Sequence, residues 1–313
     1  MEHLRWLAQP TLHRPTVIAA FTGWNDGADA ASNAVRHLVE VWHAQPLAEI
    51  DPEEFTDFAT VRPHVRLADG VTRSIVWPTV GVWSASTPGG DVILVLGPEP
   101  ALRWRLFTEQ IIALAQRFHA GLVVTLGALL ADVPHTKAVQ LIGTATDDHL
   151  IDRFDLQRSR YEGPTGIVGV LHDACSRAGI DSVSLWAAVP AYAAQVPSPK
   201  AALALITRAC GIIGSPTPVG RLGHESHDYE QRVDSLVRED DDLVGYVARL
   251  EALDLDLDDD DEDEDDDDDD TVGGELGDDD RPSESLTPID PSAVDSDELM
   301  AEVERFLRDQ PEG

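Results

Sequence analysis

Residues 16–31, TVIAAFTGWNDGADAA, contain an apolar run, a turn with two glycines and the start of a helical pattern. The apolar run has the length of a buried strand, and the helical period continues through Ala31, Val35 and Leu38. Strand, tight turn and amphipathic helix in this order predict the opening unit of an α/β sheet. In such sheets, ligands and partners meet the loops that follow the carboxyl ends of strands. Residues 23–29 are therefore the first candidate site.

The alternation of strand and helix patterns continues to about residue 253. Strand patterns cover residues 47–50, 80–84, 91–96, 122–126, 139–144 and 181–188, and helical patterns cover 101–118, 148–154, 166–177, 199–213 and 225–253, the last with a break near 239–242. Two further β runs, 64–67 and 71–77, flank Asp69-Gly70 and predict a hairpin that 80–84 continues. The fold class is therefore α/β: a three-layer α/β/α domain with a mixed sheet, a β-hairpin insertion and C-terminal helices.

Charge divides the chain into two parts. The whole chain has 58 acidic and 23 basic residues, a net charge of −35, and residues 251–313 hold 29 of the acidic and 3 of the basic ones. Thirteen consecutive acidic residues begin at Asp258, and such a run repels itself and does not pack. We expect a domain at 1–253, a disordered acidic linker at 254–295 and an amphipathic C-terminal helix at 296–309. The helix would need a surface on which to dock, because an isolated helix of this length is marginally stable.

The composition also bears on partners and location. Binding to nucleic acid or to an anionic membrane needs clustered Lys and Arg, so an acidic chain argues against both. The N-terminus lacks the apolar core of a signal peptide, and no apolar run reaches the ~20 residues of a membrane-spanning helix. We expect a cytoplasmic protein whose Cys175 and Cys210 are reduced core residues.

The loop at 23–29 contributes the candidates Gly23, Trp24, Asn25, Asp26 and Asp29. Its glycines have Gly-x-x-x-Gly spacing, which differs from the dinucleotide-binding fingerprint, and its two aspartates would repel a phosphate. Two interpretations stay open. The loop is either a capped helix start with a buried Trp, or an interaction surface anchored by an exposed one.

The other candidates are His135, Thr136, Tyr161 and Tyr192. His135 and Thr136 follow a buried strand, at the edge of the sheet where function is expected, but no partner for His135 can be identified from the sequence. Tyr161 lies in a Gly/Pro turn before a helix. Neither the spacing of His224 and His227 nor the cluster around His149 fits a metal motif. We expect no catalytic residue, no metal and no cofactor.

Several segments together resemble the bacterial branch of the proteasome-assembly-chaperone family. They are residues 21–31, 50–58, 62–63, 133–136, 161–166, 189–192, 198–199 and 302–307. The resemblance implies a phosphorylase/hydrolase-like α/β/α fold that usually self-associates, with trimers among the expected forms, and no accepted catalytic residue.

The resemblance also implies specific partners. Eukaryotic and archaeal relatives act as chaperones on proteasome subunits, and some end in a hydrophobic–Tyr–any tripeptide that docks on the proteasome ring. This sequence ends Gln310-Pro311-Glu312-Gly313, so we do not expect that docking device here. Some relatives carry an ATP-grasp ligase label, but no phosphate loop or metal-binding carboxylate pattern supports it in this sequence.

Two hypotheses follow. The first is a non-enzymatic, homo-oligomeric protein of the assembly-chaperone type with an unidentified protein partner, whose contact surface includes residues 23–29. The alternative is a small-molecule-binding protein or an enzyme, ATP-grasp-ligase-like or phosphorylase/hydrolase-like, that uses the loops at 23–29 and 134–137.

Overall fold

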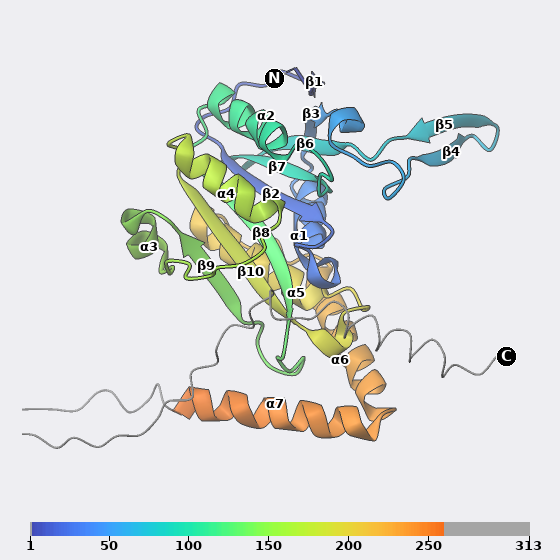
Figure 1. Ribbon diagram of the computed structural model, residues 1–313, viewed down its shortest axis with the longest axis vertical. Coiled ribbons are helices and arrows are strands. Elements are labelled where there is room, and N and C mark those ends of the chain that lie inside the picture. Colours follow the sequence, from blue (N-terminus) through green and yellow to red (C-terminus); the bar gives the residue numbers. More distant parts are fainter. Residues whose placement is uncertain (1, 260–313) are drawn as a thin grey trace, which may run out of the picture. The chain divides into compact units, whose positions relative to one another are not determined.

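A computed structural model describes residues 2–259 of the chain (Figure 1). The predicted terminal helix and the linker beyond residue 259 lie outside the described residues. The strands are β1 Leu4–Trp6, β2 Thr16–Thr22, β3 Gln45–Ile50, β4 His64–Ala68, β5 Thr72–Val76, β6 Val80–Thr87, β7 Gly90–Pro98, β8 Leu122–Ala131, β9 Leu141–Ala145 and β10 Ser182–Pro190. The α-helices are α1 Ala30–Val41, α2 Trp104–Arg117, α3 Asp148–Phe154, α4 Ile167–Arg177, α5 Pro199–Ile213, α6 Leu222–Arg238 and α7 Asp241–Asp259.

The main sheet has eight strands in the order β1-β3-β6-β7-β2-β8-β10-β9. Its four central strands, β7, β2, β8 and β10, are mutually parallel, and antiparallel strands extend the sheet on both sides. The central strands are continuous apolar runs because helices cover both of their faces. Their carboxyl ends therefore meet at one edge of the sheet.

Alternate residues of β2 supply the two faces of the core. Ile18 and Ala20 pack in one hydrophobic cluster with residues of α1 and α5. Val17, Ala19 and Phe21 pack in a second cluster with residues of α2 and α4. This arrangement of helices, sheet and helices confirms the predicted three-layer α/β fold with a mixed sheet.

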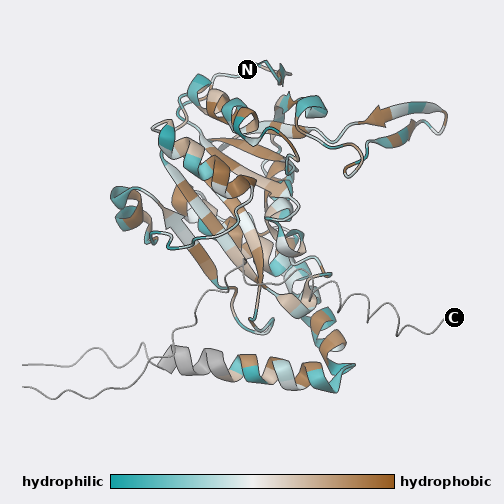
Figure 2. Ribbon diagram, viewed as in Figure 1, coloured by the Kyte–Doolittle hydropathy of each residue, from teal (hydrophilic) through white to brown (hydrophobic). Residues whose placement is uncertain are grey.

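The predicted hairpin is β4 and β5, which pair with each other across Asp69-Gly70 and form a separate two-stranded sheet. It extends away from the main sheet in Figure 1, and hydrophobic residues lie on both of its strands in Figure 2. The expectation that residues 80–84 continue the hairpin is wrong. Those residues begin β6, which pairs with β3 and β7, because its alternating side chains Val80 and Val82 fill the core.

The long polar pattern at 225–253 forms two helices, α6 and α7, with the break where it was predicted. A third hydrophobic cluster joins them through Tyr229, Val233 and Val247 and includes Ala193, which follows β10. The first six residues of the expected linker, 254–259, belong to α7. None of the helices within residues 2–259 combines the length and the hydrophobicity needed to cross a lipid bilayer.

Candidate functional site

The carboxyl edge of the parallel strands gathers most of the candidate residues. Residues 23–29 follow β2, Glu99 follows β7, His135 follows β8 and Tyr192 follows β10. This is the edge at which open α/β sheets bind their ligands. The residues nevertheless form two separate polar clusters.

The backbone of the 23–29 loop is firmly held. The Ala128 amide donates to the Asn25 carbonyl at 2.8 Å, and the Ser198 amide donates to the Ala28 carbonyl at 2.9 Å. Ala28 and Asp29 both adopt left-handed backbone angles, with φ of 48° and 54°. Non-glycine residues rarely adopt such angles, so the surrounding contacts must impose them. The loop is therefore a fixed platform, and it presents Trp24 with 66% of its surface exposed.

Asp26 caps helix α1 from inside this loop. Its Oδ1 accepts hydrogen bonds from the amides of Ala31 at 2.8 Å and Ser32 at 3.0 Å. Burial raises the pKa of the Asp26 carboxyl, and Oδ2 has no hydrogen-bond partner within the described part of the chain. The amides that could cradle a phosphate at the start of α1 are thus already bound to a carboxylate of the chain itself.

Asn25 belongs to the first cluster, which is centred on Glu99. The Asn25 Nδ2 donates to Glu99 Oε1 at 2.7 Å, and the Ile167 amide donates to the same oxygen at 2.8 Å. The carboxylate thereby lies at the N-terminus of α4, where the helix dipole favours negative charge. A Cβ on Gly166 would lie 2.1 Å from Asn25 Oδ1, so only glycine fits there. Sequence reasoning missed Glu99, although its place directly after a buried strand was a usable signal.

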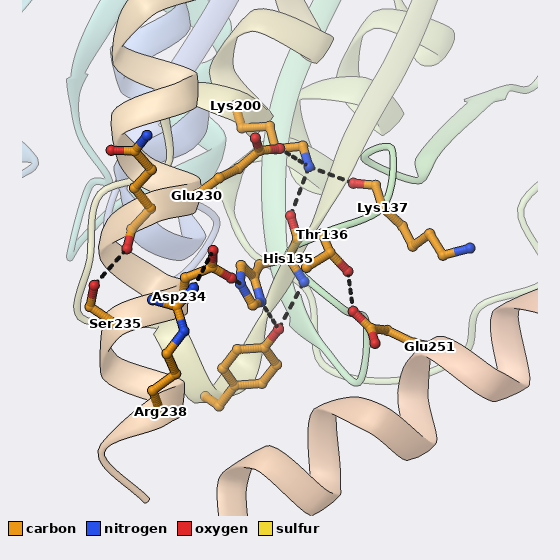
Figure 3. A network of polar contacts seen from close by, with 11 residues as sticks. His135, Thr136, Lys137, Lys200, Glu230, Asp234, Ser235, Arg238 and Glu251 are labelled. Atoms are coloured by element: carbon orange, nitrogen blue, oxygen red, sulfur yellow. Dashed lines mark hydrogen bonds and ion pairs between the residues drawn. The ribbon is translucent and has the colours of Figure 1, made fainter.

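His135 is the centre of the second cluster, which we call the His135 cluster and define as His135, Tyr192 and Asp234 (Figure 3). The Tyr192 hydroxyl accepts from the His135 amide at 2.8 Å and lies 2.7 Å from Nδ1, to which it donates. In the neutral ring the proton then lies on Nε2, which donates to Asp234 Oδ1 at 3.0 Å. Burial raises the pKa of Tyr192 to about 12, so the phenol keeps the proton that this arrangement needs.

The loop at 134–137 also joins three helices. Lys200 of α5 donates to the carbonyls of His135 at 2.7 Å and Lys137 at 2.6 Å, and forms an ion pair with Glu230 of α6 at 2.6 Å. Thr136 Oγ1 donates to Glu251 of α7 at 2.5 Å, as Figure 3 shows. These contacts fasten α5, α6 and α7 to the end of β8. No sequence signal could have found Asp234, because it is 99 residues from His135.

The structure therefore brings His135 together with Tyr192, and Asn25 together with Glu99. Trp24 and Tyr161 stand exposed, and the Tyr161 hydroxyl donates to the Pro164 carbonyl at 2.8 Å. The pocket that His135 lines has a volume of about 20 Å³. Among the residues that the structure describes, none from the 23–29 loop lines this pocket. Within residues 2–259, no three His, Cys, Asp or Glu side chains are grouped so that they could hold a metal ion.

Comparison with known proteins identifies the family. Residues 20–237 match the model of the PAC2 family. The chain belongs to the PAC2 family. A PAC2 family protein from Streptomyces avermitilis is 43% identical, with a TM-score of 0.69, and the match covers 74% of this chain and 99% of that one. The proteasome-assembly chaperone homologue Rv2125 of Mycobacterium tuberculosis has the same identity and coverage and a TM-score of 0.68.

A more distant likeness shows the fold alone. The archaeal proteasome-assembly chaperone homologue PbaA of Pyrococcus furiosus is 14% identical, with a TM-score of 0.55, over 80% of this chain and 99% of that one. No functionally curated protein matches the chain. The predicted family and the predicted fold class are both confirmed.

Proposed function

We propose that this PAC2 protein is a self-associating protein-interaction module of the assembly-chaperone type. Membership of the PAC2 family and 43% identity to a protein described as a proteasome-assembly chaperone homologue support the general role. The observation that carries the proposal is the apolar face of the β4–β5 hairpin.

The hairpin exposes one apolar face. Val65 and Ile75 are directly paired across the two strands, and Leu67 lies two residues further along on the same side. Each of the three side chains is more than half exposed. An isolated two-stranded hairpin is marginally stable in water, and an exposed apolar sheet face is typical of an interaction surface. Another molecule that covers this face would stabilise the hairpin and remove its apolar side chains from water.

Charge favours a second copy of the chain as the covering molecule. Residues 61–77 contain three arginines, Arg62, Arg66 and Arg73, against one acidic residue, Asp69. Residues 1–250 as a whole have 29 acidic and 20 basic residues, a net charge of −9. A basic hairpin on an acidic protein is complementary to the remaining surface of another copy. Trp24, which its loop holds exposed, is the natural second contact.

The test is the mass of the full chain in solution, measured by light scattering at micromolar concentration. We expect an oligomer that Val65→Thr combined with Ile75→Thr converts to smaller species, because both changes keep β-branched side chains but remove apolar contact. Val71→Thr at the exposed hairpin turn is the matched control and should leave the mass unchanged. A wild-type monomer, or an oligomer that resists the double substitution, would refute the hairpin as the contact.

Catalysis at the 134–137 loop is not part of this proposal. The hydrogen bonds of the His135 ring are complete, and a volume of about 20 Å³ has room for little more than one water molecule. The domain boundary near residue 253, the acidic linker, the docking terminal helix and a cytoplasmic location stay predictions.

A further inference from the structure

A second polar region lies between helices α1 and α6, both of which pack on α5. It contains a pocket of about 310 Å³. One wall is Arg36 and His37 of α1, and the other includes Asp228, Tyr229 and Arg232 of α6. We propose that this α1–α6 pocket binds a small phosphate monoester that also carries a hydroxyl group. This proposal does not depend on the one for self-association.

Two arginines of the pocket have no carboxylate partner among residues 2–259. Arg221, which also lines it, is paired with Glu40 and Glu225, each at 3.2 Å. Arg36 is bonded only to the Asn33 side chain, and Arg232 has no ion pair or hydrogen bond with any residue that the structure describes. The pocket thus has, on both walls, a guanidinium group without a described carboxylate partner. Each is a planar fork that suits phosphate, and a dianionic phosphate can engage both.

His37 supplies the second observation. Its side chain is only 2% exposed, and Nε2 lies 2.7 Å from the Pro218 carbonyl, so Nε2 carries the proton that it donates. In the neutral ring Nδ1 therefore presents a lone pair, and this buried atom has no partner among residues 2–259. A buried acceptor left unpaired is costly and calls for a donor. His37 lines the pocket, and a ligand hydroxyl would provide the donor if a shift of the ring opened Nδ1 to the pocket.

The Tyr229 hydroxyl is a second buried polar group whose hydrogen bonding is incomplete. It is 3% exposed, and its hydroxyl makes no hydrogen bond of normal geometry to the described chain. Burial raises the pKa of this phenol more than the nearby Ser198 hydroxyl lowers it. The phenol therefore stays protonated and remains a hydrogen-bond donor beside the pocket.

Size and charge narrow the ligand class. A volume of about 310 Å³ is at the small end of ligand pockets. Glu225 and Asp228 on the α6 wall would repel a polyanion, so the pocket suits one phosphate group on a small polar body. The two carboxylates can accept hydrogen bonds from further hydroxyls of such a body.

The experiment measures the thermal stability and calorimetric binding of the full chain with ribose 5-phosphate, inorganic phosphate and ribose. We expect saturable stabilisation by ribose 5-phosphate, weaker stabilisation by inorganic phosphate and none by ribose. Arg36→Gln and Arg232→Gln should each weaken ribose 5-phosphate binding by about tenfold or more, as expected for a lost charged hydrogen bond. Both side chains are exposed, so the variants should fold.

Arg160→Gln is the matched control, because Arg160 is another exposed arginine without a described partner and lies outside the pocket. It should leave binding unchanged. Equal loss in Arg160→Gln would reveal general charge screening and overturn the site. Absence of stabilisation by both phosphate compounds would overturn the proposal, and equal affinity for the two would overturn the hydroxyl requirement.

Discussion

Helix α6 has polar groups on two sides, and the two sides differ in how completely those groups are paired. On one side, Asp234 and Glu230 complete hydrogen bonds and an ion pair with His135 and Lys200. On the other, at the α1–α6 pocket, the buried Nδ1 of His37 has no partner in the part of the chain that the structure describes. Each side contains a buried histidine, and Tyr229 lines the pockets on both sides. Residue type alone would mark both as sites, whereas unmet hydrogen bonding marks only the pocket.

The largest expected effect comes from removing the centre of the His135 cluster. His135→Ala leaves the Tyr192 hydroxyl without its acceptor and Asp234 Oδ1 without its donor, and should lower the free energy of unfolding by about 2–4 kcal/mol. Urea unfolding checks this. Asp234→Asn is the milder control, because its amide oxygen can still accept from Nε2. A loss below about 1 kcal/mol in His135→Ala would mean that the cluster does not hold α6 in place.

A matched pair of tyrosine changes compares a hydroxyl that is hydrogen-bonded with one that is not. Tyr192→Phe removes a hydroxyl with two described hydrogen bonds and should cost about 1–3 kcal/mol of unfolding free energy. Tyr229→Phe removes a hydroxyl with none of normal geometry and should change the unfolding free energy by no more than about 0.5 kcal/mol. Equal costs would contradict the difference between the paired and the unpaired hydroxyl. Tyr229→Phe should still weaken ribose 5-phosphate binding.

Asp26 is an intermediate case, with one oxygen paired and one not. Asp26→Ala loses the cap of α1 and should cost about 1–2 kcal/mol. Asp26→Asn keeps the Oδ1 acceptor and removes a buried charge, so it should be at least as stable as wild type at pH 7.

The pH dependence of this variant has a definite sign. Burial raises the pKa of Asp26 above 3.8, so protonation favours the folded chain. The advantage of Asp26→Asn over wild type should therefore be greatest at neutral pH and shrink as the pH falls through the raised pKa towards 3.8. Unfolding curves of both proteins between pH 7 and 4 measure it. An advantage that grows towards acid would show that the carboxyl is stabilised as an anion.

The smallest effect is on the two thiols, which have no role in either polar region. Burial raises the pKa of Cys175 to about 12 and of Cys210 to about 11. Because only thiolates react readily, both should resist a disulfide reagent in the native protein at pH 8. They lie in different core clusters, so each reports on the opening of its own layer. Fast reaction of either thiol in wild type would contradict the closed core.

The order of strands and helices could be predicted because apolar periodicity is local. The Asp69-Gly70 turn likewise marked the hairpin. The position of β6 in the main sheet and the three-residue strand β1 could not be predicted, because pairing with β3 is a non-local choice. Burial within the 23–29 loop ran against residue type, since Asn25 and Asp26 are buried and Trp24 is exposed. The backbone path of the turn determines which side chain points outward.

Contacts between residues that are far apart in the sequence could not be predicted either, because they too are non-local. The sequence identifies the loop of His135 by its place after a buried strand. Asp234, in contrast, is one of several acidic residues on a polar helix. Arg36 and Arg232 are ordinary surface arginines in the sequence, and only the folded chain places them on facing walls. The candidate residues at the sheet edge follow strands, and apolar periodicity can locate those strands. The chemistry between them depends on the tertiary structure.

The tight contact at Gly166 has a genetic consequence. Even alanine there would collide with Asn25, at the junction of the loop after β2 and the start of α4. In a saturation mutagenesis screen, position 166 should tolerate almost no replacement, while the exposed neighbours Arg160 and Glu162 accept more. A compensating change would have to shorten residue 25, for example Asn25→Gly. Such a suppressor pair, recovered by selection alone, would report that the two segments touch in living cells.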